Sequence, residues 1–362
     1  MAIGCAKLCI ILCLSALGAG AGIRTSAVFG TETATGPYKH PASVAELANG
    51  DLYLAYYGGG GEYERETAVY GARRAKGSSE WTRPAAIARD PFRSVGNAVV
   101  WQAPDGAVWL FYVVRYGETW STSRIQMKVS RDGARTWSDP SMLAVAGMPA
   151  EGMMVRNAPV VLPSGEYLLP LYHEAGGDRE SVGKDSTSRF ARFDPKTGQW
   201  KASGVVRSAK GNIQPAPASL GDGRVIAFCR RGGGYGPVTD GYLVRAESTD
   251  GGRTWSEGRD SEFPNPNSAV DLLRLRNGRL MLVYNASMSE RTPLRVAVSE
   301  DGGRSWPRQV DIGTGKNSFA YPFAIQKRDG GIAVVYTTDG RKRIMLCEFE
   351  EADIPAVAKV LP

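Results

Sequence analysis

The sequence predicts an all-β protein folded as a six-bladed β-propeller, and three observations lead to this prediction. A hairpin pattern of apolar strand, glycine turn and apolar strand recurs six times along the chain. A second turn, which contains aspartate and ends in tryptophan, recurs out of phase with the first. The composition, with 44 glycines and 21 prolines among 362 residues, is typical of many short strands joined by turns.

The first hairpins are marked by glycines that lie between two apolar segments. Asn-Gly, Asp-Gly or Ser-Gly between alternating apolar residues is a strong indication of a β-hairpin. The six turn glycines stand 52 to 59 residues apart and are Gly50, Gly106, Gly165, Gly223, Gly278 and Gly330. We expect all six turns on one face of the disc.

The second hairpins follow the pattern S-x-D-x-G-x-x-W. Residues 248–255 and 299–306 match it in full, and residues 130–137 match it except for an alanine at the glycine position. Trp81 and Trp200 take the corresponding places after weaker versions. We expect the aspartate to accept backbone N–H bonds and the tryptophan to pack into the neighbouring sheet, which gives both a structural role. Two hairpins per repeat make a four-stranded blade.

The sixth repeat has a third strand at residues 342–349 but no tryptophan turn after it. We predict that Thr25 to Phe29, which precede the first hairpin, supply the missing outer strand. This pairing would close the ring and remove open sheet edges. No linker is evident, so residues 22–362 are predicted to form one propeller.

Residues 1–21 are typical of a cleavable signal peptide. The apolar run from Leu8 to Ala21 follows Lys7, contains no acidic residue and is too short to span a bilayer. We therefore expect a secreted or periplasmic protein without stable membrane insertion. Cleavage would leave Cys229 and Cys347; a bridge between them is open, but a chain of this size can bury a core without a disulfide.

The charge balance indicates an acidic rather than a nucleic-acid partner. The formal charge of +7 becomes about +6 without residues 1–21 (43 minus 37), and the basic residues are spread along the chain. The glycine runs at 58–61 and 232–234 lack the Lys-Ser/Thr of a phosphate loop. We expect an exported monomer that recognises an acidic glycan, with no cofactor.

The tryptophan turns resemble the Asp-boxes of sialidases, and the resemblance extends along the whole chain after residue 21. Residues 265–268, 291–294 and 320–322 are similar to a sialidase-like branch of that superfamily. The resemblance implies a secreted glycoside hydrolase that acts on terminal acidic sugars. It also implies three arginines that bind the substrate carboxylate, a tyrosine nucleophile assisted by a glutamate, and an aspartate acid/base.

Topology selects pocket residues independently of the family. If the turns share one face, the starts of first strands and the ends of second strands lie on the other, around the axis. The substrate-binding candidates are Arg230, Arg291, Lys39, Asn267, Asp271 and Arg156, and the catalytic candidates are Tyr321, Glu62, Glu64, His40, His173 and Gln214. The two histidines have no third ligand in view, so we expect no metal site.

The resemblance matches three of these positions in identity and place: Arg230, Arg291 and Tyr321. Lys39 stands where the first clamp arginine would be, and Gln214 stands where the glutamate partner of the tyrosine would be. A lysine retains the positive charge but loses the bidentate fork, and a glutamine accepts no proton from a phenol.

The acid/base aspartate has no equivalent, although Glu62 or Glu64 could reach its place. These departures leave two other functions open. The protein could be a polysaccharide lyase acting on uronate-containing glycans through Tyr321 and His40 or His173, or a glycan-binding propeller without catalysis.

Overall fold

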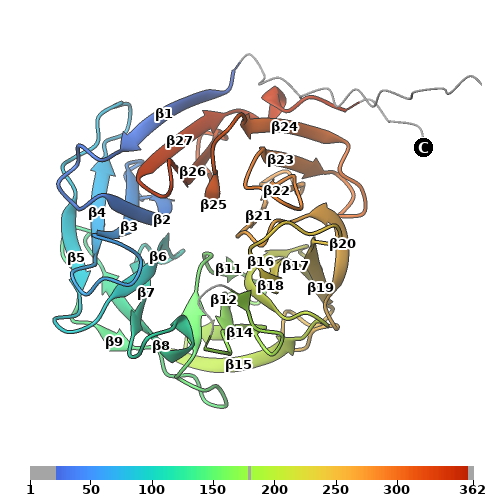
Figure 1. The fold of residues 1–362 in the computed structure, drawn as a ribbon, viewed down its shortest axis with the longest axis horizontal. Coiled ribbons are helices and arrows are strands. Elements are labelled where there is room, and N and C mark those ends of the chain that lie inside the picture. The colour runs from blue at the N-terminus through green and yellow to red at the C-terminus, as the bar shows by residue number, and fades with distance from the viewer. Residues whose placement is uncertain (1–21, 178–180, 358–362) are drawn as a thin grey trace, which may run out of the picture.

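The computed structural model describes residues 22–177 and 181–357. It confirms an all-β fold: six antiparallel sheets surround a central axis as the blades of a propeller (Figure 1). The predicted signal peptide, residues 1–21, lies outside the described residues. No helix in residues 22–177 or 181–357 has the length and apolar character needed to cross a membrane.

In each blade the first-named strand lies nearest the axis and the last-named strand lies outermost. Blades 1 to 3 contain β2 (Tyr38–Glu46), β3 (Leu52–Gly59), β4 (Ala68–Arg74) and β5 (Ala85–Arg89); β6 (Val95–Gln102), β7 (Val108–Arg115), β8 (Ser123–Ser130) and β9 (Ser141–Met142); and β10 (Met153–Val155) with β11 (Val160–Val161), β12 (Tyr167–His173), β14 (Thr187–Asp194) and β15 (Gln199–Val206). Blades 4 to 6 contain β16 (Asn212–Ser219), β17 (Val225–Arg231), β19 (Tyr242–Ser248) and β20 (Arg259–Pro264); β21 (Asp271–Arg274), β22 (Leu280–Asn285), β23 (Leu294–Ser299) and β24 (Arg308–Gly313); and β25 (Ala320–Gln326), β26 (Ile332–Thr338), β27 (Arg343–Phe349) and β1 (Arg24–Phe29).

The ring is closed by its two most distant strands. β1 pairs antiparallel with β27, so that Arg24 lies opposite Glu348 and Thr25 opposite Cys347. The outer strand predicted at residues 25–29 is therefore present. Outside the blades, a short sheet joins β13 (Ser181–Val182) to β18 (Gly233–Gly234), and two 3₁₀ turns lie at Trp120–Thr122 and Glu351–Asp353.

The repeated turns have the geometry that the sequence predicts. The six turn glycines have φ values between 83° and 101°, a region that side chains with a Cβ rarely adopt. In the second hairpin of blade 4, Asp250 Oδ1 accepts the backbone N–H groups of Arg253 and Thr254, both at 2.9 Å. Trp255 stacks on Phe190 of the neighbouring blade, with ring centroids 4.1 Å apart. Trp200 differs from the prediction, because it belongs to strand β15 rather than to a turn.

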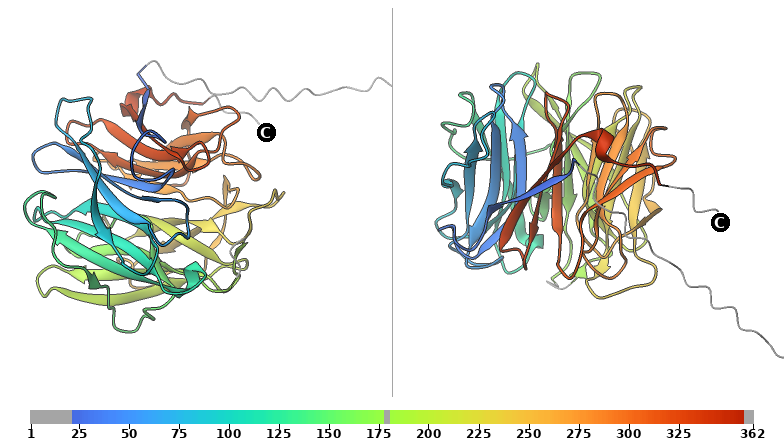
Figure 2. Two further views of the ribbon diagram at one scale, coloured as in Figure 1. Left: turned by 60° about the vertical axis from the view of Figure 1, so that its left-hand side comes forward. Right: turned by 90° about the horizontal axis from the view of Figure 1, so that it is seen from above.

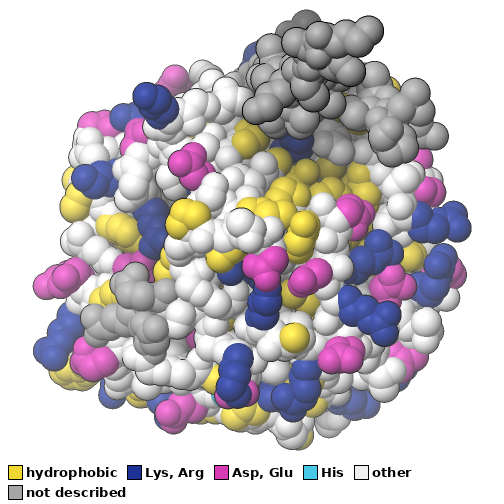
Figure 3. All heavy atoms as spheres, turned by 45° about the vertical axis from the view of Figure 1, so that its right-hand side comes forward, with side chains coloured by type: hydrophobic (Ala, Val, Ile, Leu, Met, Phe, Trp, Pro, Cys, Tyr) yellow, Lys and Arg dark blue, Asp and Glu magenta, His cyan; other side chains and the backbone are white. Residues whose placement is uncertain are grey.

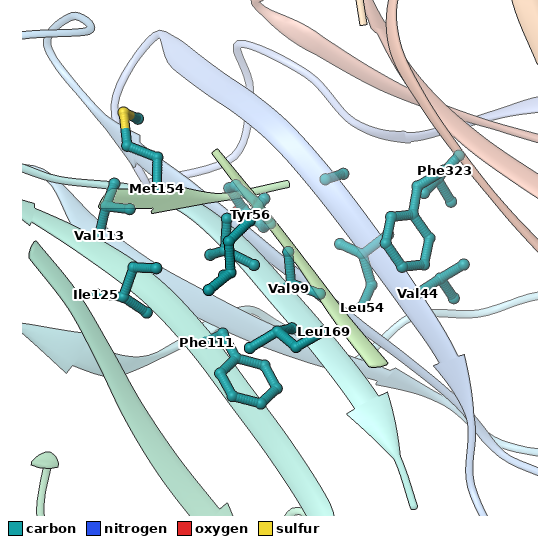
Figure 4. Close-up of a cluster of buried hydrophobic side chains, with 14 of the residues drawn as sticks. Val44, Leu54, Tyr56, Val99, Phe111, Val113, Ile125, Met154, Leu169 and Phe323 are labelled. Atoms are coloured by element: carbon teal, nitrogen blue, oxygen red, sulfur yellow. The ribbon is translucent and has the colours of Figure 1, made fainter. Parts of the chain in front are cut away.

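The core lies between blades as well as within them. Figure 4 shows side chains from several sheets meeting, among them Leu54 of β3, Val99 of β6 and Phe323 of β25, all at most 1% exposed. Blades packed face to face bury both sides of their inner strands, which explains why these strands are apolar almost throughout. Each such side chain contributes roughly 1.5–3 kcal/mol of burial free energy, so the ring is a stiff support for its axis.

Both cysteines in the described part of the chain are buried and free. Cys229 lies in β17 and Cys347 in β27, so the bridge that the sequence left open is not formed. On the face drawn in Figure 3, Lys and Arg side chains are interspersed with Asp and Glu. No group of three or more potential metal-ligating His, Cys, Asp or Glu side chains occurs within the described part of the chain.

Candidate functional site

The inner strands surround two hollows, one at each end of the axis. The right-hand view of Figure 2 shows the strands running roughly along this axis, so the two ends of each strand lie on opposite faces of the ring. One hollow of about 680 Å³ is lined by residues beside the glycine turns. The other, about 460 Å³, is lined by starts of first strands and ends of second strands. This second hollow, called the axial pocket below, is the end that topology selected.

The axial pocket is rich in charged and aromatic groups. Its lining residues are His40, Glu62, Tyr63, Asn97, Thr119, Trp120, Met154, Tyr172, Glu174, Gly176, Ile213, Gln214, Arg230, Tyr235, Arg291, Ser318, Tyr321, Gly340 and Arg341. Six of the twelve predicted site residues are among them: Tyr321, Gln214, Arg230, Arg291, His40 and Glu62.

Bulges in the inner strands direct side chains into this pocket. Four blades have a register shift at the pocket end of the inner strand, and in three of them the shift contains a non-glycine residue with positive φ. These residues are Asn97 (44°), Gln214 (54°) and Tyr321 (56°), and all three line the pocket. Positive φ strains a residue with a Cβ, so rigid neighbouring strands must hold it there.

Tyr321 lies at the centre of the pocket. Its hydroxyl oxygen accepts hydrogen bonds from Arg230 Nη1 at 2.9 Å and from Gln214 Nε2 at 3.3 Å. Arg230 Nη1 also donates to Gln214 Oε1 at 3.2 Å, and Arg230 Nε donates to Asn267 Oδ1 at 2.6 Å. Asn267 is itself fully buried, so it positions Arg230 instead of lining the cavity.

Two further arginines complete the positive side of the pocket. Arg291, between β22 and β23, has its guanidinium carbon 5.7 Å from the ring centroid of Tyr321. Arg341 lies in the turn between β26 and β27, where its Nη1 donates to Tyr38 Oη at 3.2 Å and also to Glu62 Oε2. Glu62 Oε1 accepts a third hydrogen bond, from Trp120 Nε1 at 3.2 Å. Glu62 therefore holds Arg341 in the pocket.

Burial and charge act in opposite directions on these groups. Burial alone raises the pKa of Tyr321, but the positive charges of Arg230, Arg341 and Arg291 outweigh it, so the net pKa lies below the usual 10. Burial lowers the pKa of Arg291 to about 10, with help from the charge of Arg230. An anionic group bound beside Arg291 would remove much of this cost.

Glu174, just after β12, is the pocket carboxyl most easily kept protonated. Burial raises its pKa to about 7; the charge of Arg230 lowers the pKa, and that of Glu62 raises it further. No hydrogen bond to its side chain is recorded within residues 22–177 and 181–357. A carboxyl with this pKa can act as a proton donor near neutral pH.

His40 is a neutral member of the pocket. Burial, reinforced by the charges of Arg341 and Arg291, holds its pKa well below 6.5. Its Nδ1 lies 2.7 Å from Thr337 Oγ1, and Thr337 Oγ1 donates to the carbonyl of Ala320 at 3.2 Å. Because the hydroxyl proton is used in that way, Nδ1 carries the ring proton and Nε2 is left as an acceptor.

The other six predicted site residues do not line the pocket; besides Asn267 and two residues deeper along the axis, they are Lys39, Glu64 and His173. Lys39 is buried and its Nζ donates to the carbonyl of Gly36 at 2.5 Å, so it does not replace a clamp arginine. Glu64 is exposed to solvent beyond the rim. His173 is absent from the lining while its neighbours Tyr172 and Glu174 are present, because alternate side chains of a strand point to opposite faces.

Arg156 and Asp271 lie deeper along the axis. Arg156 is 1% exposed, and its Nη2 donates to the backbone carbonyls of Tyr321 and Pro322 at 2.7 and 2.9 Å. It therefore supports the bulge of Tyr321 from below. Asp271 accepts the backbone N–H of Ala324 at 2.7 Å and lines the hollow on the turn face. Neither side chain reaches the axial pocket.

The sequence analysis missed Arg341, and a signal for it was present. Arg341 follows the second strand of blade 6, and Arg230 ends the second strand of blade 4, so one topological rule selects both. Tyr172, Tyr235 and Trp120 were also missed. Aromatic residues are frequent in this chain and give no local sign that distinguishes a pocket wall from a core.

Comparisons with known proteins agree with this architecture. Residues 50–334 match the family model described as a BNR repeat-like domain. No curated protein matches the chain in sequence. Among solved structures, a protein of unknown function from Dyadobacter fermentans is 18% identical, with a TM-score of 0.74 over 91% of this chain and 99% of its own.

Two enzymes of known type share the fold. The intramolecular trans-sialidase from Ruminococcus gnavus is 14% identical, with a TM-score of 0.73 over 92% of this chain and 98% of its own. The NanB sialidase from Streptococcus pneumoniae is 12% identical, with a TM-score of 0.73 over 91% of this chain and 71% of its own. At these identities the similarity shows the fold.

Proposed function

The chain belongs to the family of BNR repeat-like domains, and from this premise and the geometry of its axial pocket we propose that it is a glycoside hydrolase of the exo-sialidase type, acting on terminal acidic sugars. The observation that carries the proposal is the group of three arginines, Arg230, Arg291 and Arg341, gathered around Tyr321 in one pocket. A second copy of this charge pattern is absent from the other axial hollow among the described residues.

The three arginines favour an anionic ligand with planar oxygens. Guanidinium groups bind carboxylates through pairs of parallel N–H···O bonds, and such charge-assisted bonds are the strong ones. Within residues 22–177 and 181–357, Arg291 has few polar partners: its Nη2 donates to the carbonyl of Asn267 at 3.2 Å. We propose that its other N–H groups bind a sugar carboxylate in the pocket.

Tyr321 and Glu174 are proposed as nucleophile and acid. A phenol oxygen can attack an oxocarbenium-like centre without the repulsion that a carboxylate nucleophile would meet from an anionic sugar. Glu174, with its pKa near 7, would supply the proton that the departing glycosidic oxygen needs. Glu62 has the different task of holding Arg341.

We further propose that the protein works outside the cytoplasm on an acidic glycan. The basis is the apolar segment that ends at Ala21, with its typical signal-peptide pattern. Export would bring the pocket to glycans that carry terminal sialic acid or uronate.

A substrate screen with two matched variants tests the hydrolase proposal. The purified protein would be incubated with a fluorogenic sialoside and with uronate-bearing glycans, and released sugar and new ultraviolet absorbance would be measured. Tyr321→Phe should lower turnover by at least ~100-fold, because it removes the attacking oxygen. Tyr116→Phe removes the same atom from a tyrosine that is 41% exposed and is not among the lining residues, and it should leave turnover unchanged.

A glycan-binding function without catalysis is the second candidate, and Gln214 favours it. This side chain donates to Tyr321 where a carboxylate would accept its proton. Absence of turnover on every substrate, together with sialic acid binding that Arg291→Ala weakens by tenfold or more, would support this function. New ultraviolet absorbance from an unsaturated product would instead indicate a lyase with His40 as the remaining histidine candidate.

A further inference from the structure

The hydroxyl oxygen of Tyr321 is surrounded by hydrogen-bond donors. A protonated phenol would need a hydrogen-bond acceptor there for its own proton. Arg230 Nη1 and Gln214 Nε2 both donate to it. Exchanging the amide nitrogen and oxygen of Gln214 would cost a hydrogen bond, because Oε1 accepts from Arg230 Nη1 in the present orientation. In the described parts of the chain, no acceptor is recorded for a proton on Tyr321. Two donors on one phenol oxygen are the arrangement that suits a phenolate.

The charges around Tyr321 favour the same form. Guanidinium carbons of Arg156, Arg291 and Arg230 lie 5.3, 5.7 and 5.9 Å from its ring centroid. The titratable and charged groups that face it from the neighbouring elements are Arg156, Arg230, Arg291, Arg341, His40, Glu62, Glu174, Tyr172 and Tyr235. Four of these are cations and two are carboxyls, of which Glu174 is half-protonated near pH 7. The net charge of the groups around Tyr321 is therefore positive.

We propose that Tyr321 is held as a phenolate by Arg230 and Gln214, and that this replaces the carboxylate base which the position of Gln214 lacks. The inference rests on the proposed hydrolase function for its chemical use. In this proposal Gln214 is a positioning residue: its amide N–H stabilises the phenolate, which a carboxylate at the same place would repel. The net lowering of the Tyr321 pKa has the same direction.

With Tyr321 already deprotonated, the first step of the reaction needs no general base. The phenolate oxygen forms a bond to the anomeric carbon, the bond from that carbon to the glycosidic oxygen breaks, and the oxygen takes the proton of Glu174. Water next attacks the anomeric carbon and gives a proton to the Glu174 carboxylate, and the bond to Tyr321 breaks. Sugar, alcohol and the original phenolate result, with retained configuration.

An ultraviolet titration of the tyrosines tests the phenolate in the full-length chain without substrate. The wild type should show one phenol that ionises at lower pH than the others, and Tyr321→Phe should lack it. Tyr235→Phe is the matched control, because Tyr235 lines the same pocket but burial raises its pKa. The early ionisation should survive in that variant. Coincident titrations of the wild type and Tyr321→Phe would overturn the proposal.

Two charge variants sharpen the result. Arg341→Gln, in an exposed turn, should move the early ionisation up by ~1 pH unit, because one nearby cation is lost. Gln214→Glu should also move it up, because an anion then lies beside the phenol. An unchanged ionisation in both variants would overturn the proposal.

The titration separates this inference from the hydrolase proposal. An early-ionising Tyr321 in a protein that hydrolyses nothing would support the phenolate and contradict the hydrolase. Hydrolysis that depends on Tyr321 without an early ionisation would overturn the phenolate alone.

Discussion

The two faces of the ring use the same strands for different purposes. On the turn face, a glycine with φ near 90° stands in the first hairpin of every blade, and the aspartate turn recurs in blades 2, 4 and 5. On the pocket face, each blade contributes a different side chain, and several are strained or buried charges, such as Tyr321 at φ 56° and Arg230 at 2% exposure. The contrast indicates that the turn face supplies stability and the pocket face spends part of it on function.

A tryptophan of the turn face should show the largest effect on stability and none on binding. Trp306 is 7% exposed, with its ring 5.3 Å from Phe263 and 5.9 Å from Phe228. Trp306→Ala should lower the free energy of unfolding by about 3–5 kcal/mol, measured by denaturant titration. Sialic acid affinity, measured by calorimetry where the variant is folded, should be unchanged; a parallel loss of affinity would mean that the two faces are coupled.

An arginine of the pocket face should show the opposite pattern. Arg230→Ala removes the donor to Tyr321 and a clamp group, so affinity for sialic acid should fall by ~100-fold, from charge-assisted bonds worth about 1.5–3 kcal/mol each. Calorimetry with sialic acid and with a neutral analogue measures this. Arg253→Ala, at an exposed turn-face arginine, is the control and should leave both affinities intact. Equal losses for the acidic and neutral sugars would make Arg230 structural.

Glu174 should make stability and activity depend on pH in a predictable direction. Its folded pKa of about 7 lies above the ordinary value for glutamate, so its contribution to stability is complete at acidic pH and is lost as pH rises toward and through 7. Glu174→Gln should therefore be more stable than the wild type at pH 8, by on the order of 1–2 kcal/mol after allowance for partial exposure.

Thermal melts of both proteins from pH 4 to pH 8 measure this difference. Hydrolysis by the wild type should decline as pH rises through 7, since the acid form is consumed. A stability difference that grows toward acidic pH would contradict the assignment to Glu174.

Single turn glycines should show the smallest effects. Gly106 and Gly165 have φ values of 87° and 83°, and a Cβ at either would meet no atom within 4 Å. Gly106→Ala and Gly165→Ala should each cost only about 1 kcal/mol, from backbone strain alone. Chemical denaturation measures both, and clearly unequal costs would show that the repeated turns are not equivalent.

The turn face could be predicted from the sequence because it repeats. Each turn depends on local residues such as Gly106 or Asp250, and six similar signals reinforce one another. Strand topology also placed Tyr321, Gln214 and Arg230 correctly at the pocket end, since their position follows from where a strand begins or ends.

The remaining pocket residues depend on geometry that one sequence does not reveal. His173 and Glu174 differ by one position, and the alternation of a strand directs only Glu174 inward. Lys39 precedes the residue that faces the cavity, and its ammonium is taken by the carbonyl of Gly36. Asp271 was assigned to the wrong end of the axis. Arg341 comes from a loop whose direction is set by its contact with Glu62, far away in sequence.

The pairing of β1 with β27 imposes an order on biosynthesis. Arg24 and Glu348 are opposite each other in the sheet, so β1 has no partner in its blade until β27, much later in the sequence, has been synthesised. Until then, β1 must be kept from pairing with other strands, and blade 6 has no outer edge. Closure of the ring is thus a late step that brings together two ends of a long loop, with the slow folding expected of such distant contacts. A nascent chain that stalls before Arg343 would contain five blades and only the inner hairpin of the sixth, β25 and β26.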